Sequence, residues 1–301
     1  MSLSLSFTNP ILSRYVYSAA FSHPFPLSHP HFLFLSPHSP TKSRFHILYR
    51  VPQRATALST TASIFQDIAA SAAVFAGAYA LIFTFDTLTR KELIQQSLSR
   101  KLVHIVSGLL FAISWPIFSN TIEARYFASL VPLVNCLRLV IHGLSLADDQ
   151  SLIKSVTREG NPKELLRGPL YYVVMLMLCA LLFWRESPVG VISLGMMCGG
   201  DGFADIMGRK FGSSKIPYNQ NKSWVGSISM FVAGFFISTG MVYSYSALGY
   251  FELDWGYAMH RIALVSLAAT VVESLPISNL IDDNISVPLA SMLAAYFTFT
   301  Y

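Results

Sequence analysis

Charged side chains are scarce in this chain of 301 residues. Asp, Glu, Lys and Arg together make up 12% of it, whereas soluble domains usually carry about 25%. Hydrophobic residues make up 53%, and the mean hydropathy is +0.49. This composition excludes an ordinary soluble enzyme, a disordered chain and a nucleic-acid-binding protein, because the last two need many more charged residues. We therefore expect most of the chain to lie in a membrane.

Acidic residues are absent before Asp67, although that stretch contains five basic residues. The remainder holds 16 Lys and Arg against 16 Asp and Glu, so the formal net charge of +5 arises from the N-terminal segment. Residues 1–60 are also rich in Ser and Thr and in proline, which opposes helix formation. A Ser-rich, Arg-containing segment without acids is typical of an organellar transit peptide. We predict that residues 1–60 are a disordered, cleaved chloroplast transit peptide.

Cysteine is rare as well. Cys136, Cys179 and Cys198 each stand alone inside apolar sequence, without the spacing of a zinc site or of a disulfide framework. We interpret them as small hydrophobic side chains in a reducing compartment.

Eight apolar runs follow the N-terminal segment, and a helix needs about 20 apolar residues to cross a bilayer. They predict an all-α fold for residues 61–301, a multi-pass bundle with about 7–8 transmembrane helices. The runs cover residues 67–85, 102–118, 126–147, 169–184, 188–208, 226–250, 262–275 and 285–301.

Basic residues alternate between the segments that connect these runs. The gaps 86–101, 148–168 and 209–222 hold four Lys and Arg each, the gap that follows each of them holds one, and the gap 276–284 holds none. The positive-inside rule produces this alternation when successive loops face opposite compartments. It supports seven crossings up to residue 275. In a chloroplast membrane we expect the basic side to face the stroma, together with the acidic gap 276–284.

Two carboxylates stand four residues apart inside the fifth apolar run, at Asp201 and Asp205. On a helix they share one face, and so close together they require a positive charge between them. A Mg²⁺ ion held by one or two carboxylates and by substrate phosphates meets this requirement. Gly208 and Gly212 continue the same face and leave room for a phosphate chain or for a neighbouring helix. The alternative for these glycines is a seam of helix packing.

Cations flank this acidic pair. Lys215 and Lys222 follow it, while Arg100 and Lys101 begin the second span beside His104. Such cations suit the phosphates of a nucleotide, because they neutralise charge that shifts during phosphoryl transfer. No P-loop is present, so a nucleotide must bind to a different scaffold. The alternative is that the lysines only set the topology of the loops.

A second acidic group lies near the C-terminal end. Glu273 lies near the end of the seventh run, and Asp282 and Asp283 precede the eighth. An ionisable residue near the end of a membrane span is by default a candidate for function. The alternative for the two aspartates is that they cap the last helix.

These motifs together resemble the plant chloroplastic phytol kinases. The resemblance runs from about residue 67 to 301 and includes Gln95 to His104, Met197 to Asn219, Lys222 to Trp224 and Asp282 to Pro288. Asp201, Ala204, Gly208 and Gly212 are also similar to a pattern in polyprenol and dolichol kinases. Those enzymes use CTP, as do the membrane cytidylyltransferases that share part of the motif.

The resemblance implies a kinase that transfers the γ-phosphate of CTP, or of UTP, to free phytol. The product, phytyl phosphate, would serve tocopherol synthesis. In this scheme Asp201 and Asp205 hold Mg²⁺, and Lys215 and Lys222 neutralise charge. One of Glu273, Asp282 or Asp283 orients or deprotonates the alcohol.

Three alternatives remain at this point. The first is a farnesol or geranylgeraniol kinase, since the sequence does not indicate which length of prenyl alcohol is bound. The second is a lipid-phosphate cytidylyltransferase. The third is a transporter, which the absence of a repeat of the Asp201 motif disfavours. In each case the partners are membrane lipid and small molecules.

Overall fold

The computed structural model describes residues 57–147, 152–153, 156–157, 160–276 and 281–300. Residues 1–56 of the predicted transit peptide therefore lie outside the described residues.

The described chain is almost entirely helical, which confirms the predicted all-α class. The long helices are α1 (Ala57–Arg90), α2 (Gln96–Ser114), α3 (Ala124–Gly143), α5 (Gly168–Leu182), α8 (Trp224–Ala247), α9 (Trp255–Ser274) and α10 (Asp283–Thr300). The shorter elements are the 3-10 helices η1 (Trp115–Ile117) and η2 (Pro162–Leu166), α6 (Pro188–Leu194), the π-helix η3 (Gly195–Gly200), α7 (Asp201–Phe211) and the strands β1 (Lys215–Ile216) and β2 (Asn219–Ser223). The antiparallel hairpin of β1 and β2 was not predicted from the sequence.

Seven helical segments in the described part of the chain are long and apolar enough to cross a membrane. They end at or before Ser274 and match, one for one, the seven apolar runs predicted as spans up to residue 275. The eighth apolar run also forms a helix, α10, but its mean hydropathy does not place it among the seven. The seventh run was predicted too short. Its helix begins at Trp255 because the Asp254 side chain caps it by accepting from two backbone N–H groups, those of Gly256 and Tyr257.

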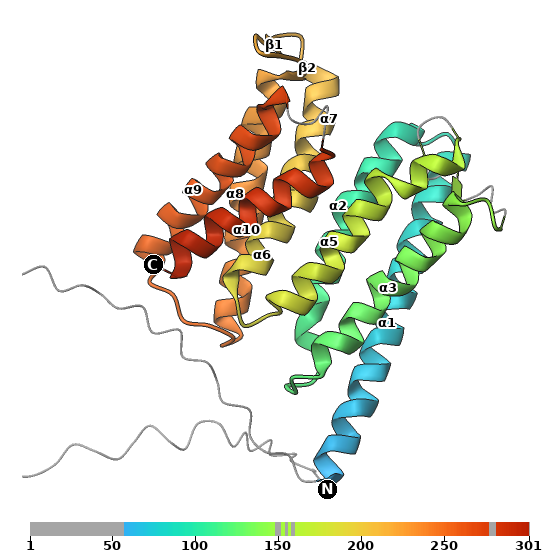
Figure 1. Cartoon of the computed structure of the whole chain (residues 1–301), viewed down its shortest axis with the longest axis vertical. Coiled ribbons are helices and arrows are strands. Elements are labelled where there is room, and N and C mark those ends of the chain that lie inside the picture. Colours follow the sequence, from blue (N-terminus) through green and yellow to red (C-terminus); the bar gives the residue numbers. More distant parts are fainter. Residues whose placement is uncertain (1–56, 148–151, 154–155, 158–159, 277–280, 301) are drawn as a thin grey trace, which may run out of the picture. The chain divides into compact units, whose positions relative to one another are not determined.

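The helices form two groups that lie side by side (Figure 1). In one group α1, α2, α3 and α5 contact one another, and in the other α6 to α10 do so. The groups meet where α5 contacts α6 and α10, and where α2 contacts η3 and α7. The segment Pro188–Phe211 is the most deeply buried of the seven spans, because 83% of the residues in its most apolar stretch are buried inside the protein. The acidic pair is therefore carried by the most enclosed helix.

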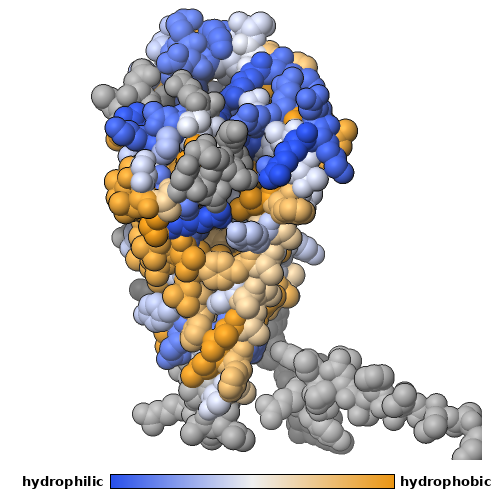
Figure 2. All heavy atoms as spheres, turned by 90° about the vertical axis from the view of Figure 1, so that its right-hand side faces the viewer, coloured by the Kyte–Doolittle hydropathy of each residue, from blue (hydrophilic) through white to orange (hydrophobic). Residues whose placement is uncertain are grey.

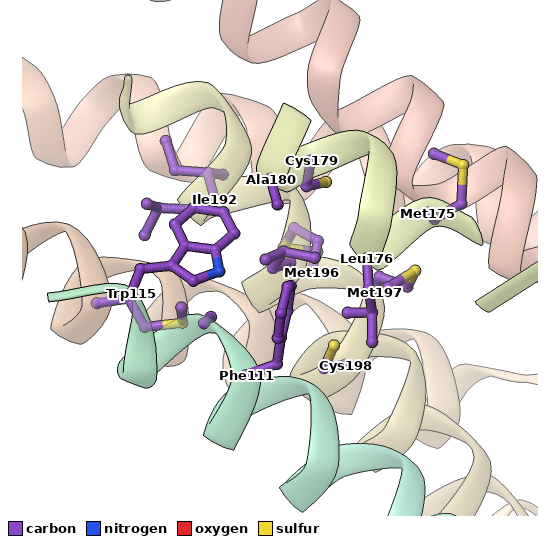
Figure 3. Packing of buried hydrophobic residues seen from close by; sticks show 14 of the residues in the cluster. Phe111, Trp115, Met175, Leu176, Cys179, Ala180, Ile192, Met196, Met197 and Cys198 are labelled. Carbon is purple, nitrogen blue, oxygen red and sulfur yellow. The ribbon is translucent and has the colours of Figure 1, made fainter. Parts of the chain in front are cut away.

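Large apolar side chains fill the junction between the two groups (Figure 3). Phe111 and Trp115 approach from α2 and η1, Leu176 comes from α5, and Met196 and Met197 come from η3. All five are buried. Burial of this size stabilises the contact between the groups by about 1.5–3 kcal/mol for each side chain.

Polar side chains concentrate at one end of the protein, above a surface dominated by apolar side chains (Figure 2). The apolar surface includes Phe83, Ile113, Leu137, Phe236 and Leu264, all of which are exposed. Exposed apolar patches of this extent indicate contact with a membrane or another protein. Because the helices have the length of membrane spans, we assign this surface to the lipid.

Candidate functional site

One cavity of about 1560 Å³ opens among the ends of α1, α2, α5, α7, α8 and α10. Its lining includes residues from the gaps 86–101, 148–168, 209–222 and 276–284, so these four segments come together as the loop charges predicted. Every candidate residue singled out from the sequence lines it: Arg100, Lys101, Asp201, Asp205, Gly208, Gly212, Lys215, Lys222, Glu273, Asp282 and Asp283.

A lysine lies between the two carboxylates of α7. The Lys101 Nζ atom is 3.4 Å from Asp201 Oδ2 and 3.7 Å from Asp205 Oδ2. The positive charge that the acidic pair requires is thus supplied in part by the protein itself. Asp205 also forms an ion pair with Arg209, one turn further along α7, at 2.9 Å.

Close packing of glycines brings Lys101 to this position. A Cβ atom on Gly202 would lie 2.2 Å from the side chain of Ile105, and one on Gly199 would lie 2.4 Å from that of Ile237. Only glycine allows α2 and α8 to approach the η3–α7 segment so closely. Since Lys101 stands one turn before Ile105 and Gly202 follows Asp201, this contact sets the lysine beside the carboxylate.

A second lysine joins the C-terminal acidic residues to the hairpin. The Lys222 Nζ atom contacts the Glu273 carboxylate and is 2.8 Å from Asp283 Oδ2. The hairpin is attached to the end of α9 because the Asn219 amide donates to the carbonyls of Ser274 and Leu275, both at 3.1 Å. Lys222 is therefore placed at the acidic group by backbone structure as well as by charge.

Electrostatic interactions link the charged group around Lys101 with the charged group around Lys222. Burial opposes the charge on Lys222, but Glu273 and Asp283 outweigh it and raise the pKa of Lys222 above its ordinary value. Burial raises the pKa of Asp283, Lys222 offsets part of this effect, and Asp201 adds to it. Asp201 and Asp283, from α7 and α10, are thus close enough to repel each other.

Asp282 and Gly212 make the contacts expected from their alternative interpretations, a helix cap and a site of helix packing. Asp282 accepts hydrogen bonds from the Asn284 backbone at 2.9 Å and from its side chain at 2.8 Å, so it caps the start of α10. A Cβ atom on Gly212 would lie 2.3 Å from Ser223 Oγ. This glycine, with Gly208 beside it, lets α7 pack against the start of α8.

The acidic residues also fit a divalent cation that arrives with phosphates. Asp205 Oδ2, beside Asp201 on the same face of α7, is buried and accepts no hydrogen bond from any described group. Such oxygens are suited to bind a cation. No group of three or more His, Cys, Asp and Glu side chains forms a complete metal site within the described ranges. An ion bound here would therefore need ligands from a substrate.

Sequence reasoning missed several residues of the cavity. Lys163, Arg167 and Arg209 line it, although the sequence suggested only a role in topology. The ring of Tyr172 packs on that of His104 with 4.0 Å between centroids, and its hydroxyl donates to the His104 carbonyl at 2.7 Å. Nothing marked Tyr172 in the sequence, because it is one aromatic residue in an apolar run.

Comparison with curated proteins finds close relatives. The chain is 64% identical over 241 residues to "Phytol kinase 1, chloroplastic" of Arabidopsis thaliana, covering 80% of this chain and 79% of the relative. It is 42% identical over 237 residues to "Farnesol kinase, chloroplastic" of the same plant, covering 79% and 77%. No family model and no solved structure matches it. The chain therefore belongs to the phytol kinase family, to which the farnesol kinase is related.

Proposed function

We propose that this protein is a kinase of a chloroplast membrane that transfers the γ-phosphate of CTP, or of UTP, to the hydroxyl of free phytol. The product, phytyl phosphate, then enters tocopherol synthesis. The observation that carries the proposal is that lysines and carboxylates line one cavity at the ends of apolar spans. The names of the relatives supply the class of acceptor, and the word chloroplastic in those names supports the compartment.

The position of the cavity suits two substrates of opposite character. A nucleotide triphosphate is charged and soluble in water, so it needs an opening lined by cations outside the apolar layer. A free isoprenoid alcohol stays in the bilayer. A cavity at the boundary between the two can bring the γ-phosphorus to the alcohol oxygen, and holding both reactants together lowers the barrier to transfer.

The residues divide into three roles in this proposal. Asp201 and Asp205 are the residues that would hold a Mg²⁺ ion beside the phosphates of the nucleotide. The chemistry that Mg²⁺ supplies when bound there is neutralisation of the charge on those phosphates. Lys101 and Lys215 on the cavity wall bind the phosphates, and they stabilise the charge left on CDP as the bond to the γ-phosphorus breaks.

The remaining cluster serves the alcohol. Lys222 is fixed between Glu273 and Asp283, so it presents its charge in one place. Asp283 accepts the proton of the alcohol as the oxygen bonds to phosphorus, because a raised pKa improves a carboxylate as a base. Asp282 is engaged as a helix cap and positions the start of α10.

Farnesol is the second candidate acceptor, on the basis of the relative at 42% identity. The transit peptide and the stromal position of the basic loops also belong to this proposal. In that arrangement the cavity opens toward the stroma, where the nucleotide is dissolved.

Membranes from a host that expresses the full chain test the proposal. We expect γ-labelled CTP to label phytol, with UTP next and ATP far behind, and we expect phytol to be preferred over farnesol and geranylgeraniol. Membranes without the chain provide the background. A preference for farnesol by about tenfold or more would reassign the acceptor, and transfer to no alcohol from any nucleotide would refute a kinase.

A further inference from the structure

The cavity continues beyond the charged residues into the membrane-spanning part of the protein. There its lining consists mainly of apolar side chains from α1, α2, α3 and α5. We call this part the apolar arm, and define it by Ala78, Ile82, Val103, Leu139 and Val173.

The arm reaches well below the ends of the helices. Ala78 precedes Arg90, the last residue of α1, by twelve residues, which corresponds to about 18 Å along a helix. On α3, the lining residue Asn135 precedes the final Gly143 by eight residues, or about 12 Å. Asn135 adds an amide to the lining, and the other arm residues on these two helices are hydrocarbon.

His104 marks the boundary between the arm and the charged part of the cavity. Its Nε2 atom is 4.0 Å from Asp201 Oδ2, and its ring packs on that of Tyr172. The hydroxyls of Tyr172 and Ser107 are 3.2 Å apart, and Tyr172 also donates to the His104 carbonyl. Because these hydroxyls bond to each other and to the backbone, they present little unsatisfied polarity to the arm.

We propose that the isoprenoid chain of the acceptor alcohol lies in the apolar arm, between α1, α3 and α5, with its hydroxyl group beside His104. This inference rests on the proposed function. It assigns Ala78, Ile82 and Leu139 as the residues that limit the length of the isoprenoid chain. An alcohol that enters from the lipid then reaches the carboxylates and lysines without leaving an apolar environment.

A second groove in the protein offers the competing location. It has a volume of about 400 Å³ and lies between α2 and α8, lined by Leu109, Ile113, Phe236 and Met241 among others. It shares no lining residue with the charged cavity in the described part of the chain. The arm, in contrast, lines the same cavity as Asp201 and Asp283, so we assign the substrate to the arm.

Photolabelling of the wild-type protein with a photoreactive alcohol tests where the isoprenoid chain binds. The probe is a geranylgeraniol analogue with a diazirine on its last isoprene unit, irradiated in membranes without nucleotide and displaced by excess phytol in a parallel sample. We expect the displaceable label on peptides of α1 and α3, near Ala78 and Asn135. Displaceable label on α8 near Phe236, or label that phytol does not displace, would overturn the assignment.

A pair of matched substitutions tests chain length directly. Ala78→Phe fills the deep end of the arm, whereas Ala80→Phe places the same ring on the exposed side of α1. We expect Ala78→Phe to lower phosphorylation of phytol relative to farnesol and geraniol by at least about tenfold, and Ala80→Phe to leave the ratio unchanged. An equal loss with all alcohols at normal protein level, or no change, would contradict the proposal.

The two proposals fail in different ways. Transfer of phosphate to no alcohol by the wild-type protein would refute the proposed function, while photolabelling would still decide where the chain lies. If Ala78→Phe does not accumulate, Ala78→Leu takes its place, with the same expected order of acceptors.

Discussion

Replacing Asp201 with Asn is expected to lower kinase turnover by at least about 100-fold while protein level and membrane insertion stay near wild type. The side chain keeps its size and its capacity for hydrogen bonds, but it loses the charge that faces Lys101 at 3.4 Å. If Asp201 holds Mg²⁺, a reaction that depends mainly on electrostatics loses a metal ligand. Initial rates with phytol and γ-labelled CTP, normalised to protein level, measure the effect.

The same experiment separates a metal ligand from a structural partner of Lys101. Asp254→Asn serves as the matched control, because Asp254 caps α9 and Asn caps a helix equally well. Asp205→Asn should raise the Mg²⁺ concentration needed for half-maximal rate. An Asp201→Asn protein with turnover within a few-fold of wild type, at equal protein level, would exclude the metal role for this residue.

Replacing Lys222 with Met is expected to have the second largest effect, a loss of at least about 100-fold in turnover together with reduced protein level. The lysine neutralises Glu273 and Asp283. Removing it leaves two carboxylates without their cation in a largely buried place, at a cost on the order of 3–5 kcal/mol. Quantitative immunoblots and initial rates measure the two parts separately.

A double variant distinguishes the two parts. Lys222→Met with Glu273→Gln removes one of the stranded charges, so it should recover much of the protein level but little of the turnover. Lys210→Met is the control, because Lys210 lies over the Phe211 ring outside the cluster. Recovery of turnover in the double variant would mean that Lys222 serves only to neutralise Glu273.

The fold was largely predictable because its main signal is local. An apolar run of about 20 residues predicts a membrane helix without knowledge of its neighbours. The signal failed where polar residues lie inside a helix, as at His260 and Arg261, which made the predicted seventh span too short. The hairpin was missed because it depends on contacts of Asn219 with the end of α9, more than fifty residues away.

The candidate residues were predictable by type, but their pairing was not. Carboxylates and cations within apolar sequence are conspicuous, so Asp201, Lys222 and Glu273 were found. That Lys101 lies between the carboxylates of α7 follows from the packing of Gly202 against Ile105, which no local pattern encodes. For the same reason the sequence left open whether Asp282 is catalytic. In the structure Asp282 accepts hydrogen bonds from Asn284 and therefore caps α10.

The measurement that tests the account most directly compares two labels in one assay. Membranes that contain the wild-type chain receive phytol with CTP labelled at either the α- or the γ-phosphate, and the lipid product is extracted and counted. The account predicts label in the lipid from γ-labelled CTP alone, since only the terminal phosphate is transferred. Label from α-labelled CTP would contradict it, because that result requires transfer of a cytidylyl group to the lipid.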